Sequence, residues 1–104
     1  IQKGETAVIT AAAGGVGGLA VQLLKAQQAV VIAVVGSQEK AETASALGAD
    51  HTIVGYKGYS GRVREITDGR GADVVYDSVG KDSFNESLKA LRKRGMLVLF
   101  GASS

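Results

Sequence analysis

The chain has 104 residues, of which 45% are hydrophobic and 21% charged, so it can form one globular domain and lacks the composition of a disordered segment. It contains no cysteine, which excludes a disulfide, a thiolate metal site and a thiol nucleophile within the chain and fits a reducing, cytoplasmic compartment. The net charge of +2 indicates no nucleic-acid partner, and the longest apolar run, residues 29–35, is too short to cross a membrane.

The first predicted elements are a strand, a glycine-rich turn and a helix. Residues 6–11 indicate a buried strand. An amphipathic helix over 16–27 is indicated by residues at helical spacing, namely Val16, Leu19, Ala20, Leu23, Leu24 and Gln27. Residues 12–17 read Ala-Ala-Gly-Gly-Val-Gly, which matches the GxGxxG fingerprint except for alanine in the first position. Backbone N–H groups in such a strand–turn–helix unit bind a pyrophosphate. A flexible turn without a ligand is the alternative.

Strands and helices are predicted to alternate along the rest of the chain. Strands are expected at 30–35, 52–54, 72–76 and 96–100, and helices at 38–47, 61–67 and 82–93. We expect Ser60 and Asp82 to be N-caps, and Phe84, Leu88 and Leu91 to form the buried face of the last helix. The basic cluster expected at the end of that helix comprises Lys89, Arg92, Lys93 and Arg94. Without an aromatic platform, this cluster is typical of a solvated helix cap rather than of a nucleic-acid site.

This alternation predicts an α/β fold of the Rossmann type. Five parallel strands would form a doubly wound sheet in the order 3-2-1-4-5 between two layers of helices. The order reverses between the first and fourth strands, so a ligand is expected beyond their carboxyl ends, at residues 11–17 and 77–80. The glycine turn lies at this switch point, which favours a dinucleotide site.

The residues after the second strand indicate NADP(H) rather than NAD. An NAD site usually has an acidic residue there to bind the ribose 2′-hydroxyl, whereas this chain has Val35 and Gly36. Ser37 offers a hydroxyl group and Lys40, one helical turn further, offers a cation to a 2′-phosphate. The alternative is that Lys40 is an ordinary solvated helix residue.

Four segments, spread in order along the whole chain, match one set of motifs. They are Ala-Ala-Ala-Gly-Gly-Val-Gly at 11–17, Gly-Ser-x-x-Lys at 36–40, Val-Tyr-Asp-Ser-Val-Gly at 75–80 and Phe-Gly-Ala-Ser-Ser at 100–104. In this combination the chain resembles the quinone oxidoreductase (zeta-crystallin-like) branch of the medium-chain dehydrogenase/reductase superfamily. The resemblance implies a zinc-independent reductase that transfers hydride from NADPH to a quinone or an activated alkene.

The resemblance also implies which residues hold the cofactor. The pyrophosphate would lie against Ala13, Gly14, Gly15, Val16 and Gly17. The 2′-phosphate would be surrounded by Gly36, Ser37, Lys40 and Tyr56. The nicotinamide side would be lined by Ser78, Val79, Phe100 and Gly101. Gly55 precedes Tyr56 where the family is expected to carry asparagine, so this segment departs from the pattern.

No residue of this chain is expected to be catalytic. His51 is expected to be structural or solvated, and Asp77 to serve as a cap or turn residue. The resemblance implies that the family's catalytic domain and the sixth strand lie outside the chain. Residues 1–104 are therefore expected to form a truncated NADP-binding domain that binds NADP(H) weakly at best and is inactive by itself. Without a sixth strand, residues 96–100 would be an open apolar edge, which predicts either a homodimer or aggregation.

Other function classes are weighed against this interpretation. A short-chain dehydrogenase needs Tyr-x-x-x-Lys and a P-loop NTPase needs GxxxxGK[ST], and neither motif is present. A methyltransferase would need a carboxylate after the second strand, where this chain has Val35. A Rossmann fragment or designed fold module without cofactor function is the remaining alternative.

Overall fold

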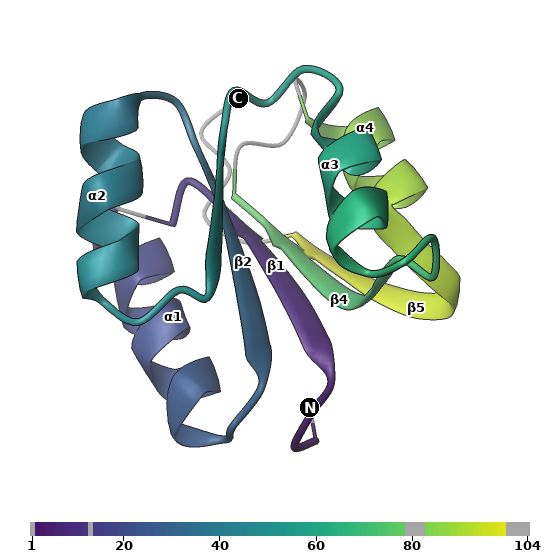
Figure 1. The fold of residues 1–104 in the computed structure, drawn as a ribbon, viewed down its shortest axis with the longest axis horizontal. Coiled ribbons are helices and arrows are strands. Elements are labelled where there is room, and N and C mark those ends of the chain that lie inside the picture. The colour runs from purple at the N-terminus through teal and green to yellow at the C-terminus, as the bar shows by residue number, and fades with distance from the viewer. Residues whose placement is uncertain (1, 13, 79–82, 100–104) are drawn as a thin grey trace.

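The computed structural model describes residues 2–12, 14–78 and 83–99. Its elements are β1 (Thr6–Thr10), α1 (Gly15–Ala26), β2 (Val30–Val35), α2 (Gln38–Ala46), β3 (His51–Val54), α3 (Tyr59–Ile66), β4 (Ala72–Asp77), α4 (Phe84–Ala90) and β5 (Leu91–Leu99). Figure 1 shows the sheet in the middle, with α1 and α2 on one side of it and α3 and α4 on the other. The predicted alternation of strands and helices is therefore confirmed.

The strands form one parallel sheet that is covered on both faces. Its order is β3-β2-β1-β4-β5, as predicted for a doubly wound fold. One core cluster, which includes Ile9 and Val31, packs under α1 and α2, and a second, which includes Val8 and Ile32, packs under α3 and α4. Because β2 is covered on both faces, residues 31–35 are all buried, which explains their continuous apolar run.

Helix α1 buries only part of its predicted apolar stripe. Leu24 is buried and Ala20 half-buried as predicted, whereas Val16, Leu19 and Leu23 are exposed. The other buried residues of the helix are Gly17, Gly18 and Val21. The two glycines let the helix lie close to the turn after β1, and this contact sets its rotation. Within the described residues, no helix has the length and apolar character needed to span a membrane.

The boundary between α4 and β5 also differs from the prediction. Helix α4 ends at Ala90, so Lys93, Arg94 and Gly95 belong to β5 rather than to the helix end. Arg94 adopts φ +66°, and the pairing of β5 with β4 shifts register between Ala72 and Val74, which indicates a bulge. The apolar residues from 96 onward therefore form only the second half of a longer edge strand.

The helix ends match local sequence signals in α2 and contradict a predicted cap in α3. Ser37 caps α2, and Gly48 follows its C-cap with φ +117°, as a C′ glycine should. The predicted Ser60 cap is wrong: α3 begins at Tyr59 with Gly58 in the cap position. The N–H and hydroxyl groups of Ser60 instead donate to Glu86 of α4, at 3.1 Å and 2.7 Å. A carboxylate from a neighbouring helix has taken over the capping role. The predicted Asp82 cap lies outside the described residues.

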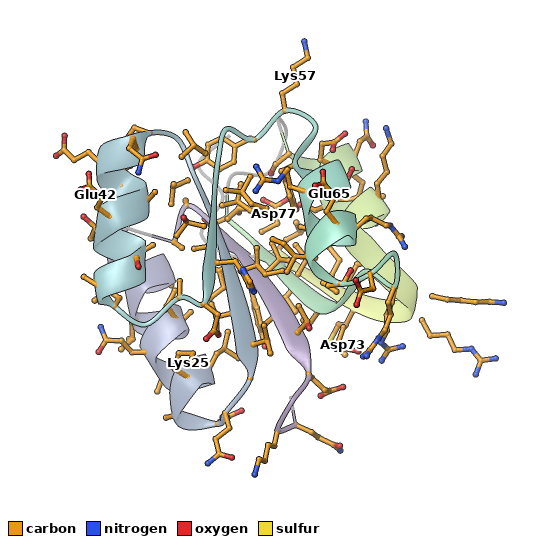
Figure 2. The ribbon with its side chains drawn as sticks, viewed as in Figure 1. Lys25, Glu42, Lys57, Glu65, Asp73 and Asp77 are labelled. Atoms are coloured by element: carbon orange, nitrogen blue, oxygen red, sulfur yellow. The ribbon has the colours of Figure 1, made fainter. Side chains whose placement is uncertain are left out.

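The carboxylate of Asp73 joins several segments at the amino end of the sheet. Asp73, near the start of β4, accepts hydrogen bonds from the Thr6 N–H of β1 at 2.7 Å, from Arg70 at 2.9 Å and 3.1 Å, and from Arg92 of β5. Burial tends to raise the pKa of Asp73, but these hydrogen bonds outweigh it and hold the pKa below its ordinary value. Asp73 and Asp77 lie near opposite ends of β4 (Figure 2), so only Asp77 belongs to the carboxyl edge.

Candidate functional site

Thr10, which ends β1, and Ser78, which directly follows β4, meet at the predicted switch point. The Ser78 N–H donates to the Thr10 hydroxyl oxygen at 2.9 Å, and the Ser78 hydroxyl donates to the Thr10 carbonyl at 3.0 Å. Two segments that are 68 residues apart in sequence are thereby joined side by side. This is the edge at which doubly wound sheets bind their ligands.

The glycine turn is packed tightly at one position and open at another. A Cβ at Gly17 would lie 2.5 Å from the Ala11 carbonyl oxygen and 3.0 Å from the Ala12 Cα, so only glycine fits. A Cβ at Gly15 would meet no heavy atom of the described residues within 4 Å, and one at Gly14 would make an ordinary contact at 3.4 Å. Gly17 therefore allows helix α1 to pack closely on the turn after β1. Gly14 and Gly15 instead leave space in front of the first turn of α1.

The N-terminus of α1 differs from that of α2. Ser37 caps α2 by accepting the Lys40 N–H at 3.3 Å, and Glu39 lies in its first turn. In the described part of the chain, α1 has neither a side-chain cap nor an acidic residue in its first turn. The N–H groups of a first helical turn have no partner within the helix, and the helix dipole favours an anion there. The start of α1 is therefore suited to binding an external anion. Helix α2 has no such need, because its own Glu39 supplies the negative charge.

Tyr56 lies between the turns that follow β1 and β2. A Cβ at Gly36 would lie 3.7 Å from the Tyr56 ring and 3.9 Å from its hydroxyl oxygen. Burial raises the pKa of Tyr56, although a hydrogen bond with the Ala11 backbone works in the opposite direction. The phenol is therefore neutral at ordinary pH. The structure thus brings Tyr56 to Gly36, which sequence spacing alone did not require.

Some of the remaining predicted site residues lie in the part of the chain that the structure describes, and others lie outside it. Val16 and Lys40 are exposed at the starts of α1 and α2, where both were expected. Ser78 lies at the carboxyl end of β4. Four predicted residues lie outside the described part of the chain, namely Ala13, Val79, Phe100 and Gly101.

The sequence interpretation missed the environment of Asp77. This residue ends β4 and is fully buried, rather than lying in an exposed turn or cap. Its carboxylate accepts hydrogen bonds from the hydroxyl groups of Thr10, Ser83 and Ser87. The signal in the sequence is the pair of serines four residues apart, which places two hydroxyl groups on one face of α4.

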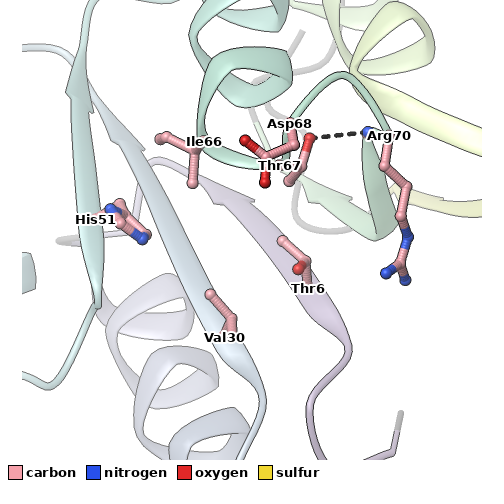
Figure 3. A pocket seen from close by; sticks show the side chains of 8 residues that line it. Thr6, Val30, His51, Ile66, Thr67, Asp68 and Arg70 are labelled. Atoms are coloured by element: carbon pink, nitrogen blue, oxygen red, sulfur yellow. Dashed lines mark hydrogen bonds between the residues drawn. The ribbon is translucent and has the colours of Figure 1, made fainter.

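A pocket of about 180 Å³ lies at the opposite edge of the sheet (Figure 3). Its lining includes Thr6 and Val30 at the starts of β1 and β2, the exposed His51 at the start of β3, and Thr67 and Asp68 after α3. The Thr67 hydroxyl oxygen accepts the Gly71 N–H at 2.8 Å. This pocket and His51 are thus separated from the switch point by the length of the strands.

A comparison with protein families identifies the chain. A family model described as zinc-binding dehydrogenase matches residues 15–104. The chain belongs to the zinc-binding dehydrogenase family. The predicted resemblance to the quinone oxidoreductase branch of the medium-chain dehydrogenase/reductase superfamily is confirmed.

Relatives of this zinc-binding dehydrogenase domain match it along its whole length. A 2-haloacrylate reductase of Burkholderia and a quinone oxidoreductase of Pseudomonas aeruginosa are each 47% identical over 105 residues, covering 100% of this chain. The crystal structure of Escherichia coli quinone oxidoreductase complexed with NADPH is 44% identical, with a TM-score of 0.92 over 100% of this chain and 32% of that one. The domain spans 32% of the length of the two curated relatives.

The family name implies zinc, but the donor groups of this chain do not suit that ion. The described residues contain no group of three or more His, Cys, Asp or Glu side chains that could hold a metal. The whole sequence has one histidine and no cysteine. Structural zinc sites need four such ligands and catalytic sites three. The described residues therefore do not fit a zinc ion.

Proposed function

We propose that this domain binds NADP(H) in an oxidoreductase that transfers hydride from NADPH to a quinone or an activated alkene. The observation that carries the proposal is the glycine turn, which is closed at Gly17 and open at Gly15 in front of the uncapped start of α1. Support comes from the NADPH-complexed relative of the same fold and from the reductase names of the other relatives. We propose that residues 1–104 act as one cofactor-binding domain.

The residues of the carboxyl edge would hold the cofactor in three places. The pyrophosphate would be bound by the backbone of Ala13, Gly14, Gly15, Val16 and Gly17. The 2′-phosphate would be bound by Gly36, Ser37, Lys40 and Tyr56. The nicotinamide and its ribose would be bound by Ser78, Val79, Phe100 and Gly101. The open space at Gly15 and the contact between Tyr56 and Gly36 fit this assignment.

The bound cofactor would supply the hydride, and the domain would supply binding and orientation. Lys40 would provide charge and Tyr56 a neutral hydroxyl donor to the 2′-phosphate, because burial raises the pKa of Tyr56. Asp77 is occupied by hydroxyl groups of its own chain and would move no proton to a substrate. Substrate binding and turnover would need residues from other parts of a full-length protein, so the domain alone is proposed to be inactive.

A titration with NADPH and NADH, followed by nicotinamide fluorescence and by calorimetry, tests the cofactor assignment. We expect NADPH to bind at least about tenfold more tightly than NADH, because a charge-assisted contact to the 2′-phosphate contributes about 1.5 kcal/mol or more. Tight binding of NADH without binding of NADPH would contradict the assignment of Gly36, Ser37 and Lys40. Binding of neither nucleotide would favour a fold module without cofactor function.

We also propose that the domain forms a homodimer through β5 in a cytoplasmic protein without a nucleic-acid partner. Strand β5 lies at one edge of the sheet, and Met96 and Leu99 are 64% and 54% exposed. Exposed apolar edges recruit further strands. Light scattering over a range of concentrations should show a mass of two chains, and pairing should be weakened by a charge at Met96, as in Met96→Lys. A monomer at high concentration would contradict the proposal.

A further inference from the structure

Helix α4 packs on the sheet with small residues rather than with its large apolar ones. Its inward face holds Ser87 and Ala90, and the preceding Ser83 is also fully buried. The large apolar residues Phe84 and Leu88, which were predicted to face the core, are 39% and 46% exposed. Amphipathic helices normally bury their apolar stripe. In this orientation the hydroxyl groups of Ser83 and Ser87 face the sheet beneath α4.

The hydroxyl groups of Ser83 and Ser87 bind the carboxylate of Asp77. Ser83 donates to its two oxygens at 2.7 Å and 2.8 Å, Ser87 donates at 2.8 Å, and Thr10 donates at 3.2 Å. A buried carboxylate is stable only when it is hydrogen-bonded in this way. In this network the hydroxyl groups of Thr10, Ser83 and Ser87 all act as donors to Asp77.

The network extends to α3 through Tyr59. The Tyr59 hydroxyl lies 2.5 Å from the Ser87 oxygen. Because the Ser87 proton is used for Asp77, Tyr59 is the donor in this contact. Burial raises the pKa of Tyr59, and the nearby charge of Asp77 adds to this, so the phenol keeps its proton. Four elements, β1, β4, α3 and α4, are thus joined at one buried charge.

Thr10 carries this network to the glycine turn. Its hydroxyl proton is directed at Asp77, which leaves the oxygen free to accept the Ser78 N–H at 2.9 Å. Thr10 directly precedes Ala11, a non-glycine residue at φ +56° whose carbonyl oxygen touches the Gly17 position. Such a conformation costs about 1 kcal/mol and persists only where its surroundings hold it. The orientation of Thr10 is therefore part of what holds the turn.

We propose that Asp77 is a positioning residue for the dinucleotide site: it orients Thr10 and, through Thr10, holds Ala11 at the start of the glycine turn beside Ser78 at the end of β4. The proposal rests on the proposed function, because it assigns the turn after β1 to the pyrophosphate. A carboxylate suits this role because it only accepts hydrogen bonds. An amide in its place would present a donor to hydroxyl groups that already donate, and at least one of them would have to turn away.

The test compares Asp77→Asn with Asp73→Asn in the same protein. Both aspartates are buried on β4 and accept several hydrogen bonds, but Asp73 lies at the amino edge, away from the proposed site. We expect both variants to lower the melting temperature. Only Asp77→Asn should weaken NADPH binding, by about tenfold, which corresponds to one misdirected charge-assisted hydrogen bond.

A second ligand separates positioning from general damage. The fragment 2′-AMP lacks the pyrophosphate and would occupy only the 2′-phosphate side at Gly36, Ser37, Lys40 and Tyr56, so its affinity should be much less affected than that of NADPH in Asp77→Asn. If Asp77→Asn does not fold, Thr10→Val, which removes the hydroxyl at similar volume, should produce the same selective loss of NADPH. Unchanged NADPH affinity in a folded Asp77→Asn or Thr10→Val, or an equal loss of 2′-AMP, would overturn the proposal. An unaltered protein that binds no NADPH would overturn the proposed function as well.

Discussion

Replacement of Gly17 by alanine is expected to abolish NADPH binding and to lower the free energy of unfolding by about 2 kcal/mol. The new Cβ would lie 2.5 Å from the Ala11 carbonyl oxygen. That carbonyl cannot move easily, because it accepts the Gly14 N–H at 3.0 Å and the Ala11 N–H donates to Val34 at 2.8 Å. Helix α1 must therefore move away from the turn. Thermal unfolding and an NADPH titration measure the two effects.

Gly15→Ala is the matched control, two residues away in the same helix. A Cβ there would meet no described heavy atom within 4 Å, and alanine in a helix is more stable than glycine by about 0.5–1 kcal/mol. We expect this variant to fold at least as well as the unaltered protein but to bind NADPH at least about tenfold more weakly, because the methyl group holds the pyrophosphate away from the backbone. Full NADPH affinity in Gly15→Ala would place the pyrophosphate elsewhere.

Gly36→Asp is expected to reverse the nucleotide preference. The carboxylate would repel a 2′-phosphate and could bind a ribose 2′-hydroxyl, as acidic residues after the second strand do in NAD sites. At a few ångströms near a protein surface this repulsion is worth about 2–4 kcal/mol, so NADPH affinity should fall by about 30-fold or more while NADH affinity rises. The fold should tolerate the change, since the nearest atoms to a Cβ are those of Tyr56, at 3.7 Å and 3.9 Å.

Gly36→Asn separates the charge from the size of the new side chain. Asparagine is almost isosteric with aspartate but neutral, so it should weaken both nucleotides to a similar and smaller extent. Calorimetric titration of both variants with NADPH and NADH gives the comparison. If the two variants change NADPH affinity equally, the 2′-phosphate does not lie at Gly36, and the assignment of Ser37 and Lys40 would be wrong as well.

Local sequence patterns were sufficient to predict the strands and helices and the order of the strands in the sheet. The apolar run at 30–35 predicted a strand that is buried on both faces, and residues 31–35 are fully buried. The alternation of strands and helices predicted the order β3-β2-β1-β4-β5, because right-handed crossovers leave few other arrangements. Steric rules also act locally, so the glycine turn could be placed at the switch point before its contacts were known.

The sequence alone determined which elements form, how the sheet is wound and where its switch point lies, because these depend on short-range periodicity and on chain handedness. Only the tertiary structure decided which face of α1 and α4 is buried. Both helices turn large apolar residues outward, since the contacts of Gly17 and the hydrogen bonds of Asp77 outweigh the apolar stripes. These are contacts between segments far apart in sequence, and helical periodicity does not encode them. Periodicity likewise does not encode the proximity of Tyr56 to Gly36, which only the family resemblance implied and which the structure shows.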